Sequence, residues 1–339
     1  MRCAAFRRSF YWGFCGRRFW LRSPAAQADP PDVSITPRFR SPDDRVRDEG
    51  AMNILERHAD LRVDATLVQI PVVVTLANSG SVVTGLQREN FHVFEGKVEQ
   101  EIASVLEEDL PLSVGVVFDT SSSMARGKMQ HAREAVGAFT KTANPEDEFF
   151  AVEFNDRPEL VVPWTLDASR IHSKLMLTQP KGSTALLDAV FLALNEMKKA
   201  HNPRKALLII SDGGDNNSRH SESEVRNAVR ETDVQIYAIG IYDFMERWQP
   251  YEEMNGRWLL QELTSYTGGR HFGIDNLADL PIVAAKIERE LRNQYVISYR
   301  PKNNRRDGKY RKVDVKLAKT NVLGTLRLQF RSGYRAPTN

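Results

Sequence analysis

Hydrophobic and polar positions divide the chain into a central region and two flanks. In the central region, continuous apolar runs alternate with segments whose apolar residues recur every three or four positions. The runs are typical of strands covered on both faces, and the spaced segments are typical of helices that bury one side. This alternation predicts an α/β fold with a doubly wound, Rossmann-like, mainly parallel sheet. Strands are expected at 112–118, 147–155, 205–211, 234–242 and 270–274, and helices at 126–143, 167–178, 184–200, 221–232, 256–267 and 279–293.

The two flanks show the alternating pattern of antiparallel strands instead. Residues 62–108 are expected to form four short strands. Residues 295–335 contain three further strand-like runs, with Asp307-Gly308 predicted as a hairpin turn between the first two. Neither set of strands buries much apolar surface alone, so we expect one small antiparallel β-sandwich built from both flanks. The alternative is two separate β appendages.

The overall composition is that of an ordinary globular protein, with 41% hydrophobic and 27% charged residues. The net charge of +3 is unevenly distributed, because residues 1–47 contain ten Arg and four Asp, which leaves about −3 on residues 48–339. A nucleic-acid-binding protein carries its positive charge on the folded body, so nucleic acid is not expected as a partner. Both cysteines, Cys3 and Cys15, lie in the basic segment, so no redox compartment can be inferred from the body.

Residues 1–28 are predicted to be either an export signal or a disordered tail. A small-residue stretch before residue 29 resembles a cleavage site, but arginines interrupt the apolar core that a signal needs. Residues 29–60, rich in Pro, Asp and Arg, are expected to form a linker. A cleaved signal would place the protein in the periplasm or outside the cell, and without one it would be cytoplasmic. No apolar run approaches the roughly eighteen residues of a membrane-spanning helix, so none is expected.

Polar side chains follow two of the buried strands, and another begins a helix predicted between them. They are Asp119, Ser121 and Ser123 after the first strand, Thr184 at the helix start, and Asp212 after the second strand. Taken singly, a Thr at a helix start is usually a cap, and an Asp-Gly pair is usually a turn. Because the carboxyl ends of parallel strands meet at the edge where ligands bind, we expect these side chains to lie together.

Two carboxylates and three hydroxyls form a set of hard oxygen ligands. Such ligands suit Mg²⁺, Mn²⁺ or Ca²⁺, and two carboxylates nearly neutralise a divalent cation. We expect Mg²⁺ first, which takes about six oxygens in octahedral geometry. If one aspartate acts through water, a coordination position remains for an acidic side chain of a partner protein.

The motifs "DTSSSM", "GST" and "SDG", in this order, resemble those of the von Willebrand factor A (VWA) domain, and the resemblance spans about 112–294. In that family, Asp-x-Ser-x-Ser, a later Thr and a later Asp form the metal-ion-dependent adhesion site (MIDAS). By position, the resemblance implies a metal shell of Asp119, Ser121, Ser123, Thr184 and Asp212. The flanks, with "EEDLPLSVGVVFDTSSSM" before the domain and "QYVISYRP" after it, resemble a bacterial subgroup described from acidobacteria. That subgroup has no settled function to carry over.

The function that we predict is non-enzymatic, metal-dependent binding of a protein that offers an acidic side chain. One alternative is a structural or scaffold protein in which the metal only ties strand ends together. Another is a metal-dependent hydrolase, for which Asp215 is the available candidate as general base. His220 and His271 are placed where they could approach the metal face, but surface or structural roles are favoured for both.

Overall fold

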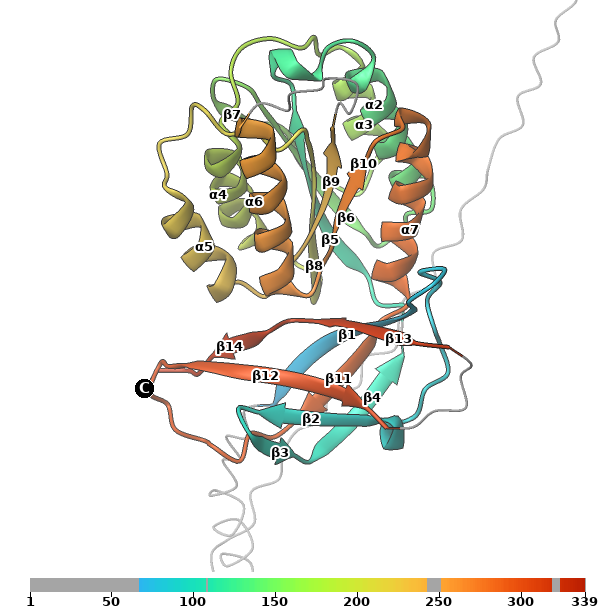
Figure 1. The fold of residues 1–339 in the computed structure, drawn as a ribbon, viewed down its shortest axis with the longest axis vertical. Coiled ribbons are helices and arrows are strands. Elements are labelled where there is room, and N and C mark those ends of the chain that lie inside the picture. Colours follow the sequence, from blue (N-terminus) through green and yellow to red (C-terminus); the bar gives the residue numbers. More distant parts are fainter. Residues whose placement is uncertain (1–66, 108, 243–250, 319–323, 339) are drawn as a thin grey trace, which may run out of the picture. The chain divides into compact units, whose positions relative to one another are not determined.

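The computed structural model of the chain is shown in Figure 1. It describes residues 67–107, 109–242, 251–318 and 324–338. The predicted tail at 1–28 and the predicted linker at 29–60 lie outside these residues, so both stay predictions. Within the described part of the chain, no helix has the length and apolar character needed to cross a membrane.

A six-stranded sheet forms the middle of the α/β region. Its strands are β5 (Leu112–Asp119), β6 (Glu148–Phe154), β7 (Pro158–Thr165), β8 (Arg204–Ser211), β9 (Gln235–Ile241) and β10 (His271–Ile274). They lie in the order β10-β9-β8-β5-β6-β7, and every neighbouring pair is parallel except β6 and β7. All residues of β5 and β9 are buried, as expected for strands covered on both faces.

Helices cover both faces of this sheet (Figure 1). They are α2 (Lys128–Thr140), α3 (Ser169–Met176), α4 (Leu186–Met197), α5 (Glu222–Glu231), α6 (Tyr251–Thr267) and α7 (Leu280–Arg292). One core cluster joins α2, α3 and α7 to the sheet, and a second joins α4, α5 and α6 to its other face. The predicted doubly wound, mainly parallel α/β fold is therefore confirmed.

Strand β7 was not anticipated in the sequence pattern. It contains Pro158 and Pro163, and among its residues only Val162 is buried. Proline cannot donate a ladder hydrogen bond, so it is tolerated at the edge of a sheet. β7 occupies that edge, antiparallel to β6, which explains why it lacks the continuous apolar run of the inner strands.

The flanks form two four-stranded sheets. The first has the order β13 (Leu326–Phe330), β1 (Val68–Leu76), β11 (Tyr295–Tyr299) and β4 (Ile102–Glu107), and the second has the order β14 (Gly333–Arg335), β12 (Tyr310–Leu317), β2 (Phe91–Glu95) and β3 (Val98–Gln100). All neighbouring pairs are antiparallel, and each sheet mixes strands from both ends of the chain. One core cluster, including Val72, Val93, Ile297 and Val313, joins the two sheets. This confirms one antiparallel sandwich built from both flanks.

The hairpin predicted at Asp307-Gly308 is wrong. β11 already has β1 and β4 as neighbours on its two sides, so it has no edge left for β12. β12 pairs with β2 and β14 in the other sheet, and Asp307 forms an isolated bridge with Thr338. Gly308 adopts a φ of +63°, so the chain does turn there, but the turn belongs to a connection between two sheets.

Candidate functional site

The five predicted ligands lie at the end of β5 and in three loops at the edge of the central sheet where its parallel strands end, here called the carboxyl edge. They are Asp119, Ser121, Ser123, Thr184 and Asp212. β5 ends at Asp119 and β8 ends one residue before Asp212, and these two strands are neighbours in the sheet. The topology therefore brings both carboxylates to one place.

The carboxylate of Asp119 is fully buried, and Asp212 is only 3% exposed. One oxygen of Asp119 accepts a hydrogen bond from the Ser121 backbone N–H at 2.8 Å, and the other accepts from the Ser211 hydroxyl at 2.6 Å. Burial, with repulsion from Asp212 as the next cause, raises the pKa of Asp119 to about 7 despite these hydrogen bonds. A divalent cation between the two carboxylates would offset both the burial and the repulsion, so the residues present fit such an ion.

Two of the three hydroxyls lie together immediately after β5. Ser121 precedes a 3₁₀ turn, η3 (Ser122–Met124), and its Oγ lies 2.9 Å from Oγ of Ser123. Ser121 is buried whereas Ser123 is exposed, so the pair leads from the interior to the surface. Thr184 is buried and directly precedes Ala185, the first flanking residue of α4. Within the described residues, no hydrogen bond joins the Thr184 hydroxyl to the other four ligands.

Hydrogen bonds from backbone N–H groups hold the three loops together. The N–H of Ser122 donates to the carbonyl of Gly182 at 3.0 Å, which joins the loop after β5 to the loop before α4. The N–H of Asn216 donates to the carbonyl of Thr184 at 3.0 Å, and the N–H of Thr184 donates to Oδ1 of Asn216 at 2.9 Å. The loop after β8 is thus joined to the loop before α4, and the relative positions of the predicted ligands are fixed.

The loop that carries Asp212 also packs closely against helix α6. Gly213 adopts a φ of +87°, a left-handed conformation that favours glycine. A Cβ added to Gly256 of α6 would lie 1.8 Å from the carbonyl oxygen of Gly213, so position 256 accepts only glycine while the loop keeps this path. Sequence reasoning missed this contact, because a glycine inside a helix pattern carries no sign of what it touches.

A lysine that the sequence analysis did not single out lies beside the predicted ligands. Nζ of Lys128 is 3.5 Å from Oδ2 of Asp212, and the two side chains are 12% and 4% exposed. Lys128 is the first residue of α2, where the helix dipole disfavours a positive charge. That unfavourable position was the one signal in the sequence that could have drawn attention to it.

The two histidines considered from the sequence have structural partners. Nδ1 of His220 lies 2.7 Å from Oδ1 of Asp188, and Nε2 of His271 lies 2.9 Å from the hydroxyl of Tyr242. Burial, followed by the charge of Arg257, lowers the pKa of His271 to about 4. Within the ranges that the structure describes, neither histidine bonds to any of the five predicted ligands.

Asp215, the candidate general base of the hydrolase alternative, is engaged at the start of α4. Its Oδ1 accepts hydrogen bonds from the Ser218 hydroxyl at 2.6 Å and from the Leu187 backbone N–H at 3.4 Å. Burial, partly offset by these hydrogen bonds, raises its pKa. The carboxylate is therefore used to hold the loop and the helix terminus.

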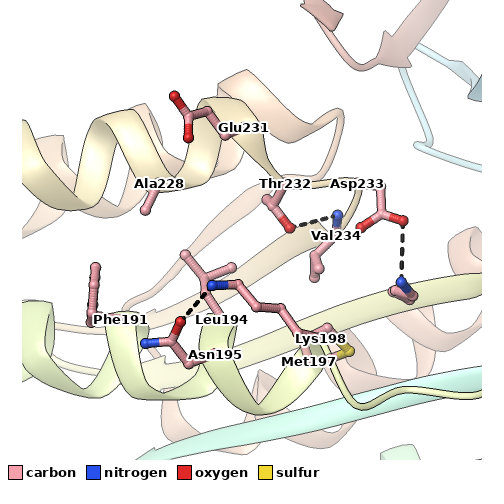
Figure 2. Close-up of a pocket in the computed structure, with 11 residues that line it drawn as sticks. Phe191, Leu194, Asn195, Met197, Lys198, Ala228, Glu231, Thr232, Asp233 and Val234 are labelled. Atoms are coloured by element: carbon pink, nitrogen blue, oxygen red, sulfur yellow. Dashed lines mark hydrogen bonds and ion pairs between the residues drawn. The ribbon is translucent and has the colours of Figure 1, made fainter. Parts of the chain in front are cut away.

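Two further features place the five ligands in context. A groove of about 580 Å³ lies between α4 and α5, lined by Phe191, Leu194 and Glu231 among others (Figure 2), and it includes none of the predicted ligands.

Among the described residues, no group of three or more His, Cys, Asp or Glu side chains is arranged to hold a metal ion. A metal at the carboxyl edge would therefore depend on hydroxyls as well as on the two carboxylates.

The sequence model of the von Willebrand factor type A domain matches residues 114–214. The chain contains a von Willebrand factor type A domain. The matched stretch includes all five predicted ligands, which supplies the family context for the geometry at the carboxyl edge.

Curated relatives of the chain include a bacterial and a human protein. An uncharacterized protein of Borreliella burgdorferi is 22% identical over 182 residues, covering 48% of this chain and 53% of that protein. Human inter-alpha-trypsin inhibitor heavy chain H4 is 26% identical over 136 residues, covering 35% of this chain and 15% of that protein. The matched region thus spans about half of the first relative and a small part of the second.

Similar solved structures include a mussel protein and a bacterial one. Proximal thread matrix protein 1 of the mussel byssus, solved with a zinc-occupied MIDAS motif, is 18% identical with a TM-score of 0.47, covering 58% of this chain and 49% of that chain. BatB of Bacteroides thetaiotaomicron is 19% identical with a TM-score of 0.43, covering 53% of this chain and 98% of that chain. None of the four relatives named here is described as acidobacterial, so that subgroup stays a prediction.

Proposed function

We propose that this protein is a metal-dependent protein-binding module whose VWA domain holds one divalent cation at a MIDAS. The observation that carries the proposal is the pair of neighbouring carboxylates, Asp119 and Asp212, which are both almost fully buried and whose repulsion helps to raise the pKa of Asp119. Two such charges repel each other, and a cation would stabilise both. The proposed ligands are Asp119, Ser121, Ser123, Thr184 and Asp212.

The donor set favours Mg²⁺, while Mn²⁺ and Ca²⁺ accept the same oxygen ligands. A bound cation would supply an electrophilic centre for one more oxygen. Asp119 would provide a buried anchor, and the exposed Ser123 marks the direction in which the site meets solvent. An acidic side chain of a partner protein, approaching from that side, is the ligand that we propose for the remaining coordination position.

Two other functions compete with this proposal. In a scaffold protein, the cation would only tie the three loops together, although hydrogen bonds from backbone N–H groups already join them. In a hydrolase, Asp215 would activate water, but its Oδ1 accepts hydrogen bonds from Ser218 and Leu187. None of the relatives named above is described as an enzyme. We therefore favour binding over both alternatives.

We further propose that the VWA domain occupies 112–294 and is inserted between two parts of the sandwich, 62–108 and 295–335. An extracytoplasmic location, in the periplasm or outside the cell, is proposed with it and depends on cleavage of a signal within residues 1–28. N-terminal sequencing of the mature protein tests the location, since a protein that keeps its first residues has not been processed.

Titration calorimetry with Mg²⁺ and Mn²⁺ tests the metal site directly. The wild type is expected to bind one ion, and Asp119→Ala is expected to bind far more weakly while keeping its circular dichroism spectrum. Asp233→Ala, which removes an exposed acid from the loop before β9, is the matched control and should bind as the wild type does. Equal affinities in all three proteins would exclude these ligands.

Affinity capture with and without chelator then separates binding from scaffolding. A partner that is lost on chelation, and lost again in Asp119→Ala, supports the binding module. Unfolding on chelation, with no metal-dependent partner, would support the scaffold instead.

A further inference from the structure

The side chain of Lys128 turns back from α2 toward the carboxyl edge. Its Nζ lies 3.5 Å from Oδ2 of Asp212, and only 12% of the lysine side chain is exposed. In the described part of the chain, Asp212 is the one acid that forms an ion pair with it. A pair this shielded from water is screened by salt much less than a surface pair.

The loop before α2 has an unusual backbone conformation, and the helix begins directly after it, at Lys128. Arg126 has a φ of +56° and Gly127 a φ of +90°, so two consecutive residues adopt the left-handed conformation. Arg126 is the one described residue other than glycine with a positive φ, and such conformations gather at functional sites. The turn places Lys128 at the first helical position, which faces the loop after β8.

The start of α2 provides no stabilising interaction for the positive charge of Lys128. The first turn of α2 contains no acidic residue, and no side chain caps it. The helix dipole disfavours a cation at this end. A lysine that is disfavoured by its own helix, and is mostly buried against Asp212, is explained by its interaction with that carboxylate.

A cation held by Asp119 and Asp212 would share Asp212 with the ammonium group of Lys128. The two positive charges would then lie within a few ångströms of each other in a poorly hydrated site. At such a separation and burial, one unit charge changes the affinity of another ion by about tenfold or more. Lys128 and the metal therefore compete for the same carboxylate.

We propose that Lys128 is a tethered competitor of the divalent cation, which weakens metal binding and leaves Asp212 when the metal binds. The proposal rests on the proposed MIDAS and adds a residue outside the metal shell that sets the affinity of the site.

A purely structural role for Lys128 predicts the opposite change in affinity. If the lysine only oriented Asp212 for the metal, its removal would weaken cation binding. If it competes with the metal, its removal strengthens cation binding. The sign of the change therefore separates the two roles.

Titration calorimetry with Mg²⁺ and with Mn²⁺ on the full chain measures this sign. Lys128→Met should bind both ions about tenfold or more tightly than the wild type. Lys128→Arg, which keeps the charge, should stay close to the wild type. Lys205→Met is the matched control, because Lys205 pairs with Asp233 at the opposite end of the strands, and its affinity should not change. Lys128→Gln replaces Lys128→Met if the latter does not fold.

Thermal unfolding in chelator provides a second readout. Without the ammonium group, Asp212 loses the cation with which it pairs, so Lys128→Met should melt lower than the wild type, and Mg²⁺ should close the gap. Unchanged or weaker cation binding in Lys128→Met, beside normal binding in the wild type, overturns this proposal alone. Absence of binding in every protein overturns the proposed metal site and this proposal with it.

Discussion

Buried carboxylates lie at both edges of the central sheet, and their partners differ. At the edge where the parallel strands begin, here called the amino edge, Asp147 is fully buried but bonded to the guanidinium of Arg292 and to the backbone N–H of Leu112. Burial alone would raise the pKa of Glu148, but hydrogen bonds from Ser113 and His201 outweigh it and hold the pKa below its ordinary value.

At the carboxyl edge, Lys128 pairs with Asp212, but the hydrogen bonds of Asp119 do not outweigh its burial. Asp119 receives two hydrogen bonds from neutral groups, and burial next to Asp212 still raises its pKa to about 7. The amino edge thus uses its acids to tie strands and helix α7 together. The carboxyl edge keeps Asp119 in a state that a bound cation would stabilise, which is how binding sites differ from structural ion pairs.

Removing the guanidinium of Arg292, which pairs with Asp147 at the amino edge, should have the largest effect on stability. Arg292→Leu leaves Asp147 buried without its guanidinium, and we expect a loss of about 3–5 kcal/mol in the free energy of unfolding. Urea unfolding followed by circular dichroism measures it. Arg289→Leu, on the exposed side of the same helix, is the matched control. Equal losses of unfolding free energy in the two variants would mean that the buried Asp147–Arg292 pair stabilises the fold no more than an exposed arginine does.

The pH dependence of the carboxyl edge should have the opposite sign to that of an ordinary ion pair. The pKa of Asp119 in the folded protein is about 7, above its ordinary value of 3.8, so the folded state binds more protons between these values. In chelator, stability should therefore fall as the pH rises from about 4 through 7, by a few kcal/mol at about 1.4 kcal/mol per pKa unit.

Asp119→Asn should remove most of this fall, because the amide does not titrate. Saturating Mg²⁺ should reduce the fall in the wild type. Chemical denaturation at several pH values measures both, with the exposed Asp233→Asn as control. A pH profile that Asp119→Asn leaves unchanged would show that another group is responsible.

The packing of the Asp212 loop on α6 can be disturbed without touching any charge. Gly256→Ala should push Gly213 away and lower the Mg²⁺ affinity by about tenfold, although alanine is the better helix former by about 1 kcal/mol. Gly137→Ala in α2, which faces only the side chain of His172, controls for helix propensity and should bind normally. An unchanged Mg²⁺ affinity in Gly256→Ala would mean that the packing of this loop on α6 does not affect metal binding.

The smallest effect is expected at the exposed hydroxyl. Ser123→Ala removes a neutral donor from the carboxyl edge and should lower the Mg²⁺ affinity by roughly fivefold, on the scale of one neutral polar contact and well below the effect of Asp119→Ala. Ser122→Ala, a neighbouring exposed serine, is the control. An effect of Ser123→Ala as large as that of Asp119→Ala would mean that charge does not dominate this edge.

Local burial explains how much of this molecule could be predicted from the sequence. The inner strands are buried on both faces, so their apolar runs stand out, and the polar residues after β5 and β8 mark their ends. The positions of Asp119 and Asp212 at the ends of neighbouring strands follow from that pattern and from the rules of parallel sheets.

Features that depend on distant pairing could not be found in this way. The turn at Asp307-Gly308 has a hairpin sequence, but β11 pairs with β1 and β4, which lie near the other end of the chain. The edge strand β7 buries too little to form an apolar run. Lys128 and Asp212 lie 84 residues apart, and nothing local connects them.

The pairing of β4 with β11 has a consequence for how the chain acquires its structure. Glu107 lies opposite Tyr295, so the sandwich strand before the VWA domain hydrogen-bonds to the strand after it. Closing a long unstructured loop between two such strands is entropically unfavourable and slows folding. Once the VWA domain has folded, β5 and α7 bring the two strand ends near each other, and the effective loop becomes short. We therefore expect the VWA domain to fold first and the sandwich to assemble around its two ends, with β1 and β4 unpaired during synthesis until their partners β11 and β13 emerge.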